Sequence, residues 1–211
     1  MIRYNQIEDP LCYPGTSVLR NKADIQDQDV LDEFEQLMFD SRAEERLPEG
    51  KLDFAHYRAL HHHFFQDVYG WAGDIRSIRT GKGANWFCYP EHIVSQAGRL
   101  FAQLADRKHF TDCSTKGEFA AAAAWFLSEI NAIHPFREGN GRIQLVFLTM
   151  LARNAGLRLN DRRLRPEPFL AAMIQSFDGD LEPLTAEIAR LLYRSGPSPH
   201  DHQPLRGPCD R

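Results

Sequence analysis

The chain has 211 residues, a length that fits one large domain or two very small ones. Apolar residues make up 43% of it and charged residues 26%, a balance that excludes collagen, a coiled coil and wholesale disorder. Its 25 lysine and arginine residues stand against 29 acidic residues, for a formal net charge of −4. Proteins that bind a nucleic acid backbone normally carry a basic surplus, so we expect no nucleic acid partner.

Cysteine spacing and apolar run length bear on location. The four cysteines lie far apart in the sequence and form no Cys-x-x-Cys pair, which is typical of reduced residues. No run reaches the roughly 18 apolar residues of a membrane span, and the N-terminus lacks the apolar core of a secretory signal. We therefore expect a cytoplasmic protein with no membrane partner. Export by a route that needs no cleavable signal stays open.

The sequence predicts three parts. Residues 1–20 form an N-terminal arm, because two prolines and the turn signal Pro14-Gly15 disfavour a helix there. Residues 21–195 carry the apolar periodicity of a single domain. Residues 196–211 have no apolar period, and we expect a disordered tail.

Helical periodicity dominates this domain. Leu60, Phe64 and Val68 repeat at intervals of four, and the five alanines of residues 120–124 strongly favour a helix. Similar patterns predict helices over residues 27–47, 53–69, 90–105, 119–133, 140–155, 161–174 and 183–193. We therefore expect an all-α fold built as a helical bundle.

A single exposed β-hairpin is expected to interrupt the helices. Residues 75–80 alternate apolar and polar side chains, residues 81–85 contain two glycines, and residues 86–89 are rich in aromatic side chains. A strand, a glycine-containing turn and a second strand are the usual components of a hairpin.

The residues between the two most apolar helices are an unusual choice for a connector. Residues 134–142 read His-Pro-Phe-Arg-Glu-Gly-Asn-Gly-Arg. Backbone N–H groups at a helix N-terminus bind anions such as phosphate, and the guanidinium of Arg142 suits phosphate oxygens. Glu138 is a candidate ligand for a phosphate-bound Mg²⁺, and His134 is a candidate proton acceptor. His-Pro or Gly-Asn-Gly alone often serves structure only, but together they favour phosphoryl or nucleotidyl transfer.

This stretch resembles the signature of the Fic (filamentation induced by cAMP) family, H-P-F-x-[DE]-G-N-G-R-x-x-R, at eight of its nine specified positions. Residues 65–76 are also similar to the segment that leads to the family's flap. The likeness extends from about Pro10 to Tyr193. It implies the Fic fold, with the hairpin as the flap.

The resemblance also implies an activity and a role for each motif residue. His134 would deprotonate a Ser, Thr or Tyr hydroxyl of a target protein, which attacks the α-phosphate of the substrate ATP. Phe136 would be a buried anchor, and Glu138 would hold Mg²⁺. The ATP phosphates would be bound by Gly139, Asn140, Gly141 and Arg142, with Lys82 and Gly83 also facing the nucleotide. The target would dock on the flap through Arg79, Thr80, Gly81, Asn85, Trp86 and Phe87, by strand addition.

One position departs from the signature. Leu145 stands where the family has its last arginine, which is expected to orient the terminal phosphate. Transfer of another group, such as UMP or phosphocholine, is therefore an alternative, and so is a nucleotide-binding module without transfer activity. Kinase-like chemistry of the Doc type is less favoured, because those proteins resemble a motif with lysine where Gly141 stands.

Two further expectations concern regulation and metal binding. The chain lacks the [ST]-x-x-x-E-[GN] pattern of the family's inhibitory helix, and the domain follows almost at once on Met1. We therefore expect a separate, antitoxin-like inhibitor. The run His61-His62-His63 is interpreted as structural, because successive helix residues point about 100° apart and do not converge on one metal ion.

Overall fold

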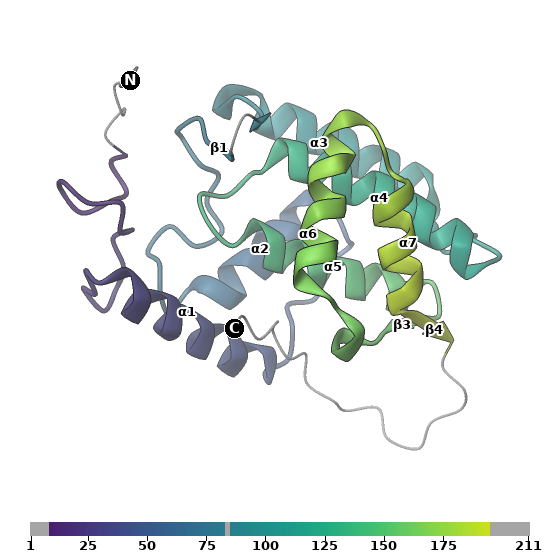
Figure 1. The fold of residues 1–211 in the computed structure, drawn as a ribbon, viewed down its shortest axis with the longest axis horizontal. Coiled ribbons are helices and arrows are strands. Elements are labelled where there is room, and N and C mark those ends of the chain that lie inside the picture. Colours follow the sequence, from purple (N-terminus) through teal and green to yellow (C-terminus); the bar gives the residue numbers. More distant parts are fainter. Residues whose placement is uncertain (1–8, 83–84, 195–211) are drawn as a thin grey trace.

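The computed structural model describes residues 9–82 and 85–194 (Figure 1). Over these residues the chain is mostly helical, which confirms the predicted all-α class. The helices are α1 (Gln28–Ala43), α2 (Phe54–Phe65), α3 (Pro90–Asp106), α4 (Lys116–Ile133), α5 (Asn140–Asn154), α6 (Pro166–Gln175) and α7 (Glu182–Leu191). Gly83, the whole of the expected tail and residues 1–8 of the expected arm lie outside the described residues.

Three helix ends differ from the prediction by four residues or more. The first helix was expected to reach residue 47, but α1 ends at Ala43. The second helix was expected to reach Tyr69, but α2 stops at Phe65 and turns over residues 66–73 follow. The sixth was expected from Asp161, but residues 161–163 form a 3-10 turn and α6 begins at Pro166. Proline has no N–H to donate, so the first turn of a helix suits it.

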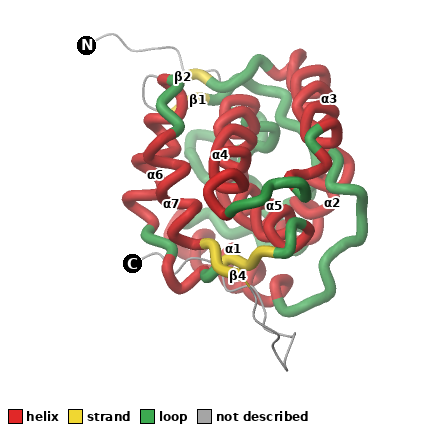
Figure 2. Tube along the Cα trace, turned by 90° about the vertical axis from the view of Figure 1, so that its right-hand side faces the viewer, coloured by secondary structure: helices red, strands yellow, loops and turns green. Residues whose placement is uncertain are grey.

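Helix α4 is central to the core. It packs against α3, α5 and α7, and Figure 2 shows it between α3 and α7. Phe119, Phe126 and Ile130 on its apolar face are fully buried, as are Ala123 and Ala124, which let neighbouring backbones approach closely. This packing fixes the C-terminal end of α4, from which the motif loop leaves.

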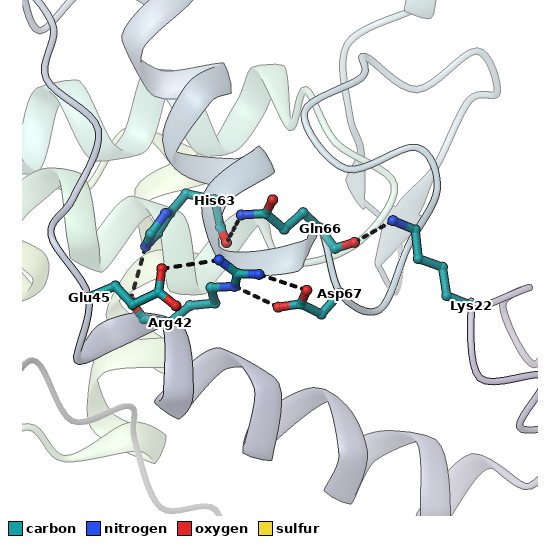
Figure 3. A network of polar contacts seen from close by, with 6 residues as sticks. All are labelled: Lys22, Arg42, Glu45, His63, Gln66 and Asp67. Carbon is teal, nitrogen blue, oxygen red and sulfur yellow. Dashed lines mark hydrogen bonds and ion pairs between the residues drawn. The ribbon is translucent and has the colours of Figure 1, made fainter.

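A polar network joins the end of α1 to the end of α2 (Figure 3). Arg42 on α1 donates two hydrogen bonds to Asp67, of 2.5 and 2.7 Å, and one to Glu45. The backbone carbonyl of Arg42 also contacts Nε2 of His63 at 3.0 Å. The guanidinium holds the pKa of Asp67 below its usual range. These contacts fix α1 against α2, and α1 contributes a side chain to the site.

The expected hairpin is present, but its strands are shorter than predicted. Gly81–Lys82 (β1) pairs antiparallel with Asn85–Trp86 (β2), and residues 75–80 are not a strand. The alternation of apolar and polar residues over 75–80 does not mark a strand with a buried apolar face. The buried side chain in this segment is Arg76, which is 3% exposed, whereas Ile75 and Ile78 are only partly buried. The guanidinium of Arg76 binds four backbone carbonyls and holds the segment as a loop.

A second antiparallel ribbon was not predicted. Leu157–Leu159 (β3) pairs with Leu192–Arg194 (β4), so the described part of the chain contains two ribbons and not one. Strands of three residues are too short to produce a readable alternation. In the described residues, no helix combines the length and apolar character that a membrane crossing requires.

Candidate active site

The motif loop leaves α4 through His134. This residue adopts the left-handed conformation, with φ of +48° and ψ of +65°, and so ends the helix. Its imidazole stacks on the ring of Phe87, with centroids 3.6 Å apart and planes 3° from parallel. Nδ1 lies 3.3 Å from the carbonyl oxygen of Asn131. The hairpin and the end of α4 therefore meet at the predicted catalytic residue.

Asn140 folds the loop back on itself. Its side chain accepts a hydrogen bond of 3.0 Å from the N–H of Phe136 and donates one of 2.8 Å to the carbonyl of the same residue. Asn140 is 3% exposed, and Phe136 is fully buried against the ring of His61, as expected for this phenylalanine. The side chain of Asn140 thus shapes the loop, because both of its polar atoms bond to the backbone of Phe136.

The two glycines of the motif differ in surroundings. Gly139 has φ of +78°, and a Cβ atom there would lie 2.3 Å from the ring of Phe65. Gly141 is exposed, and a Cβ atom there would meet nothing within 4 Å. Gly139 is therefore required by the fold, whereas the space at Gly141 is open. The first N–H groups of α5 lie in this region and have no acceptor within the helix.

His61 supports the loop from α2, a contact that the sequence did not reveal. Its Nδ1 accepts the N–H of Gly73 at 2.8 Å, so we assign the proton to Nε2, which contacts the carbonyl oxygen of Glu138 at 3.0 Å. Burial lowers the pKa of His61 to about 3. A neutral imidazole thus joins the turn after α2 to the motif loop, which agrees with the structural interpretation of the histidine run.

Arg142 is held by a buried acid from α1. Its guanidinium donates to the carboxylate of Glu35 and stacks over the ring of Phe65, 4.8 Å from the centroid. The side chains of Arg142 and Glu35 are 18% and 8% exposed. Burial raises the pKa of Glu35, and the neighbouring Arg142 opposes that shift. Glu35 lies 107 residues before its partner and belongs to no motif.

Glu138, the predicted metal ligand, lies at the surface of the loop. Its side chain is 46% exposed, and Oε1 accepts the N–H of Gly139 at 2.9 Å. Oε1 also lies 3.7 Å from the guanidinium of Arg142. Among the described residues no group of three or more potential ligands surrounds a metal position. A magnesium ion bound here would thus depend on one carboxylate and the substrate.

The N-terminal arm also contacts the loop. Nε of Arg137 lies 2.6 Å from a carboxylate oxygen of Asp9, and both side chains are largely buried. Position 137 is unspecified in the family signature, so the sequence did not indicate this contact. The arm therefore helps to hold the loop on the side of Arg137.

The flap residues divide into two groups. Phe87 is buried and faces His134, and its N–H donates to the carbonyl of Thr80 at 3.1 Å. Arg79 lies over two rings, 4.7 Å from that of Trp86 and 3.9 Å from that of Tyr89. Trp86 is 62% exposed. The structure places Gly81, Lys82 and Asn85 in the two paired strands. The paired strands and the exposed aromatic side chains of Trp86 and Tyr89 therefore lie near the motif loop.

Comparison with known proteins gives three kinds of match. The sequence model of the Fic/DOC family matches residues 51–152. A probable protein adenylyltransferase of Sinorhizobium fredii, y4lH, is 69% identical over 91% of this chain and 100% of its own length. The protein adenylyltransferase VbhT of Bartonella schoenbuchensis is 34% identical over 91% of this chain and 41% of its own length.

A solved structure agrees with these matches at the level of the fold. The BepC effector of Bartonella tribocorum, solved with bound AMPPNP, has a TM-score of 0.80. The match covers 88% of this chain and 97% of that one, at 22% identity. Together with the loop between α4 and α5, the matches identify the family: the chain belongs to the Fic/DOC family.

Proposed function

We propose that the chain is a protein adenylyltransferase, which transfers AMP from ATP to a hydroxyl side chain of a target protein. We assign the activity to a domain over residues 21–195, with residues 1–20 as an arm. The observation that carries the proposal is the loop that joins a histidine at the end of α4 to the N-terminus of α5. A candidate base and a candidate anion site are separated there by one short, rigid turn. The 69% identity to a probable adenylyltransferase supports this assignment.

The proposed chemistry is a nucleophilic displacement at phosphorus. The target's hydroxyl oxygen forms a bond to the α-phosphorus as the bond to the oxygen bridging to the β-phosphate breaks. The hydroxyl proton passes to the imidazole of His134, and pyrophosphate leaves. The N–H groups at the start of α5 and the guanidinium of Arg142 hold the phosphates and stabilise their negative charge.

The residues present fit Mg²⁺ as a partner of the substrate. Magnesium is commonly bound by one or two carboxylates together with substrate phosphates, and Glu138 offers a half-exposed carboxylate beside the α5 N-terminus. Bound there, the ion would neutralise charge on the phosphates and on leaving pyrophosphate. Glu138 would hold it through a carboxylate oxygen, while its backbone carbonyl stays tied to His61.

The flap supports the choice of a protein as acceptor. Its short strands end beside His134, and an extended peptide can pair with such an edge through backbone hydrogen bonds. We propose that Arg79, Thr80, Gly81, Asn85, Trp86 and Phe87 form this docking site. Lys82 stays a candidate nucleotide contact, and Gly83 lies outside the described residues. Pairing through the backbone would bring a target hydroxyl to His134 with little dependence on target sequence.

The test is a transfer assay with separately labelled nucleotides. The chain is incubated with a lysate and ATP labelled in the α-phosphate, and labelled proteins are identified by mass spectrometry. We expect label from the α-phosphate and none from the γ-phosphate. His134→Ala should abolish labelling while nucleotide binding, measured by calorimetry, survives.

Other outcomes decide between the alternatives. Label from the γ-phosphate would contradict nucleotidyl transfer and indicate kinase-like chemistry. Label from UTP but not ATP would indicate another donor, as the leucine at position 145 allows. Nucleotide binding without any label would favour an interaction module that lacks transfer activity.

We also propose that a separate antitoxin-like protein restrains the enzyme. Support comes from the sequence, which has no segment of the inhibitory pattern. Growth of source cells that express the chain alone should fall below that of cells expressing His134→Ala. Equal growth of the two cultures would count against such a partner.

A further inference from the structure

Arg76 is a buried cation without an acidic partner. It is 3% exposed, and no carboxylate among the described residues pairs with it. It lies in the loop between α2 and the flap, where the alternation of residues 75–80 had predicted a strand. A buried charge is costly unless hydrogen bonds or an opposite charge compensate it, so the hydrogen-bond partners of this guanidinium indicate its role in the fold.

Its contacts are four backbone carbonyls from two parts of the fold. Nε donates to the carbonyl of His134 at 2.7 Å, and Nη2 donates to that of Ile133 at 3.2 Å. Nη1 donates to the carbonyl of Ile78 at 2.7 Å, and Nη2 also donates to that of Cys88 at 2.5 Å. Two of these carbonyls therefore end α4, and the other two lie on either side of the flap.

The end of α4 compensates the buried charge. The last carbonyls of a helix have no partner within it and carry partial negative charge, so a cation there is stabilised. Backbone bonds strengthen the same junction, because the N–H of Arg76 donates to Pro135 at 3.0 Å and that of Cys88 to Ala132 at 2.9 Å. The flap base and the end of α4 thus form one hydrogen-bonded unit around the guanidinium.

We propose that Arg76 is the positioning residue that fixes the flap relative to His134, so that a docked hydroxyl meets the imidazole in one geometry. This inference rests on the proposed function, in which the flap binds the target and His134 takes its proton. The planar guanidinium is suited to the task because its donors point in several fixed directions at once. A lysine ammonium at the end of a flexible chain cannot reach carbonyls on both sides in the same way.

The kinetic test is Arg76→Lys, which keeps the charge and removes the planar fork. We expect kcat/KM for the protein target to fall about 100-fold, the scale of a small misplacement of reacting groups. Nucleotide affinity should stay within about twofold, since the phosphate groups of the proposal lie at α5. Arg58→Lys is the matched control, because Nε of Arg58 also donates to a backbone carbonyl, that of Gly73 at 2.9 Å. It should transfer at the wild-type rate.

A spectroscopic readout separates positioning from simple loss of fold. The stacked ring of Phe87 should shift the ring protons of His134 upfield in the NMR spectrum, and His134→Ala assigns the signals. In Arg76→Lys we expect the upfield shift to vanish while the melting temperature remains above the assay temperature. An unchanged shift, or equal losses of nucleotide affinity and transfer, would overturn the proposal.

Two further measurements test the role of Arg76 when the kinetic test fails. If Arg76→Lys does not fold, hydrogen exchange of the wild-type chain decides, because the amides of Arg76 and Cys88 should exchange as slowly as those in the middle of α4. Exchange as fast as that of Trp86 would overturn the proposal. If the wild-type chain transfers nothing, the proposed function fails, whereas the His134 shift in Arg76→Lys still tests the positioning.

Discussion

The guanidinium of Arg142 donates a hydrogen bond to the buried carboxylate of Glu35, which joins the first helix of the domain to the start of α5. The pair lies between aromatic rings, with the Arg142 guanidinium 5.6 Å from the Phe39 centroid and 4.8 Å from that of Phe65. The carboxylate of Glu35 on α1 therefore fixes the orientation of Arg142, the arginine proposed to hold phosphate.

Removal of either partner should destabilise the fold. Glu35→Ala leaves the largely buried Arg142 guanidinium with only the exposed carboxylate of Glu138, 3.7 Å away, and we expect the free energy of unfolding to fall by about 3 kcal/mol. In a double-mutant cycle with Arg142→Ala, the pair should show a coupling of roughly 1–3 kcal/mol by urea denaturation. Glu33→Ala, on the exposed face of the same helix, is the control. Additive effects of the two truncations would contradict the coupling.

The two motif glycines should respond differently to alanine. Gly139→Ala places a Cβ inside the ring of Phe65 at positive φ, and we expect a loss of roughly 2–4 kcal/mol of unfolding free energy. Gly141→Ala meets open space in the first turn of α5, so the fold should be retained. Because a methyl group would occupy space proposed for phosphate, nucleotide affinity should fall. Unaltered affinity of Gly141→Ala in calorimetry would place the phosphates elsewhere.

Leu145→Arg should tighten nucleotide binding and raise transfer. Leu145 lies partly buried on α5, one turn after Arg142, where the family signature has a second arginine. A new charge-assisted contact to the terminal phosphate is worth about 1.5–3 kcal/mol. Leu145→Lys provides the same charge without the fork and should gain less. If calorimetry finds ATP affinity unchanged or weaker, the site is built around leucine or ATP is not the donor.

The buried imidazole of His61 should make stability depend on pH. Its pKa is lowered to about 3 in the fold, from an ordinary value of 6.5, so between these values only the unfolded chain binds the proton. Stability is complete above the unfolded pKa and falls as the pH drops below it. Between pH 8 and pH 5 the contribution is about 2 kcal/mol.

The matched variant is His61→Asn, whose side-chain oxygen can still accept the N–H of Gly73 and which does not titrate. Its unfolding free energy should be lower than that of the wild type at pH 8 and should fall less between pH 8 and pH 5. Parallel pH profiles for the two proteins, measured by urea denaturation, would show that His61 is not the titrating group.

The parts of the fold that sequence predicted well are local ones. The helix predicted over residues 119–133 agrees with α4 to within one turn, because its apolar stripe and its alanines are local signals. Thr115, which caps the first turn at 3.1 Å from the N–H of Glu118, extends the helix back to Lys116. The motif loop was found for the same reason, since its proposed base and anion site occupy nine consecutive positions, residues 134–142. Helices and motifs that depend on neighbouring residues in this way can be predicted without knowledge of the tertiary structure.

The supporting contacts were missed because they join distant segments. Glu35 and Arg142 are 107 residues apart, His61 and Glu138 are 77 apart, and Arg76 and His134 are 58 apart. On its own helix Glu35 is one acid among several, and only packing selects it. The strand predicted over residues 75–80 is wrong for a related reason, because its buried member is the cation Arg76, and three of the four carbonyls that it binds lie outside the segment.

His134 occupies the left-handed region at the end of α4, a conformation that glycine adopts freely and that costs a histidine about 1 kcal/mol. In a library of all amino acids at this position, selection for thermal stability should therefore enrich glycine. Selection for transfer should retain histidine. With His134 as the proposed base, selection for stability and selection for transfer would favour different residues at this position, and stabilising substitutions would have to arise elsewhere in the chain.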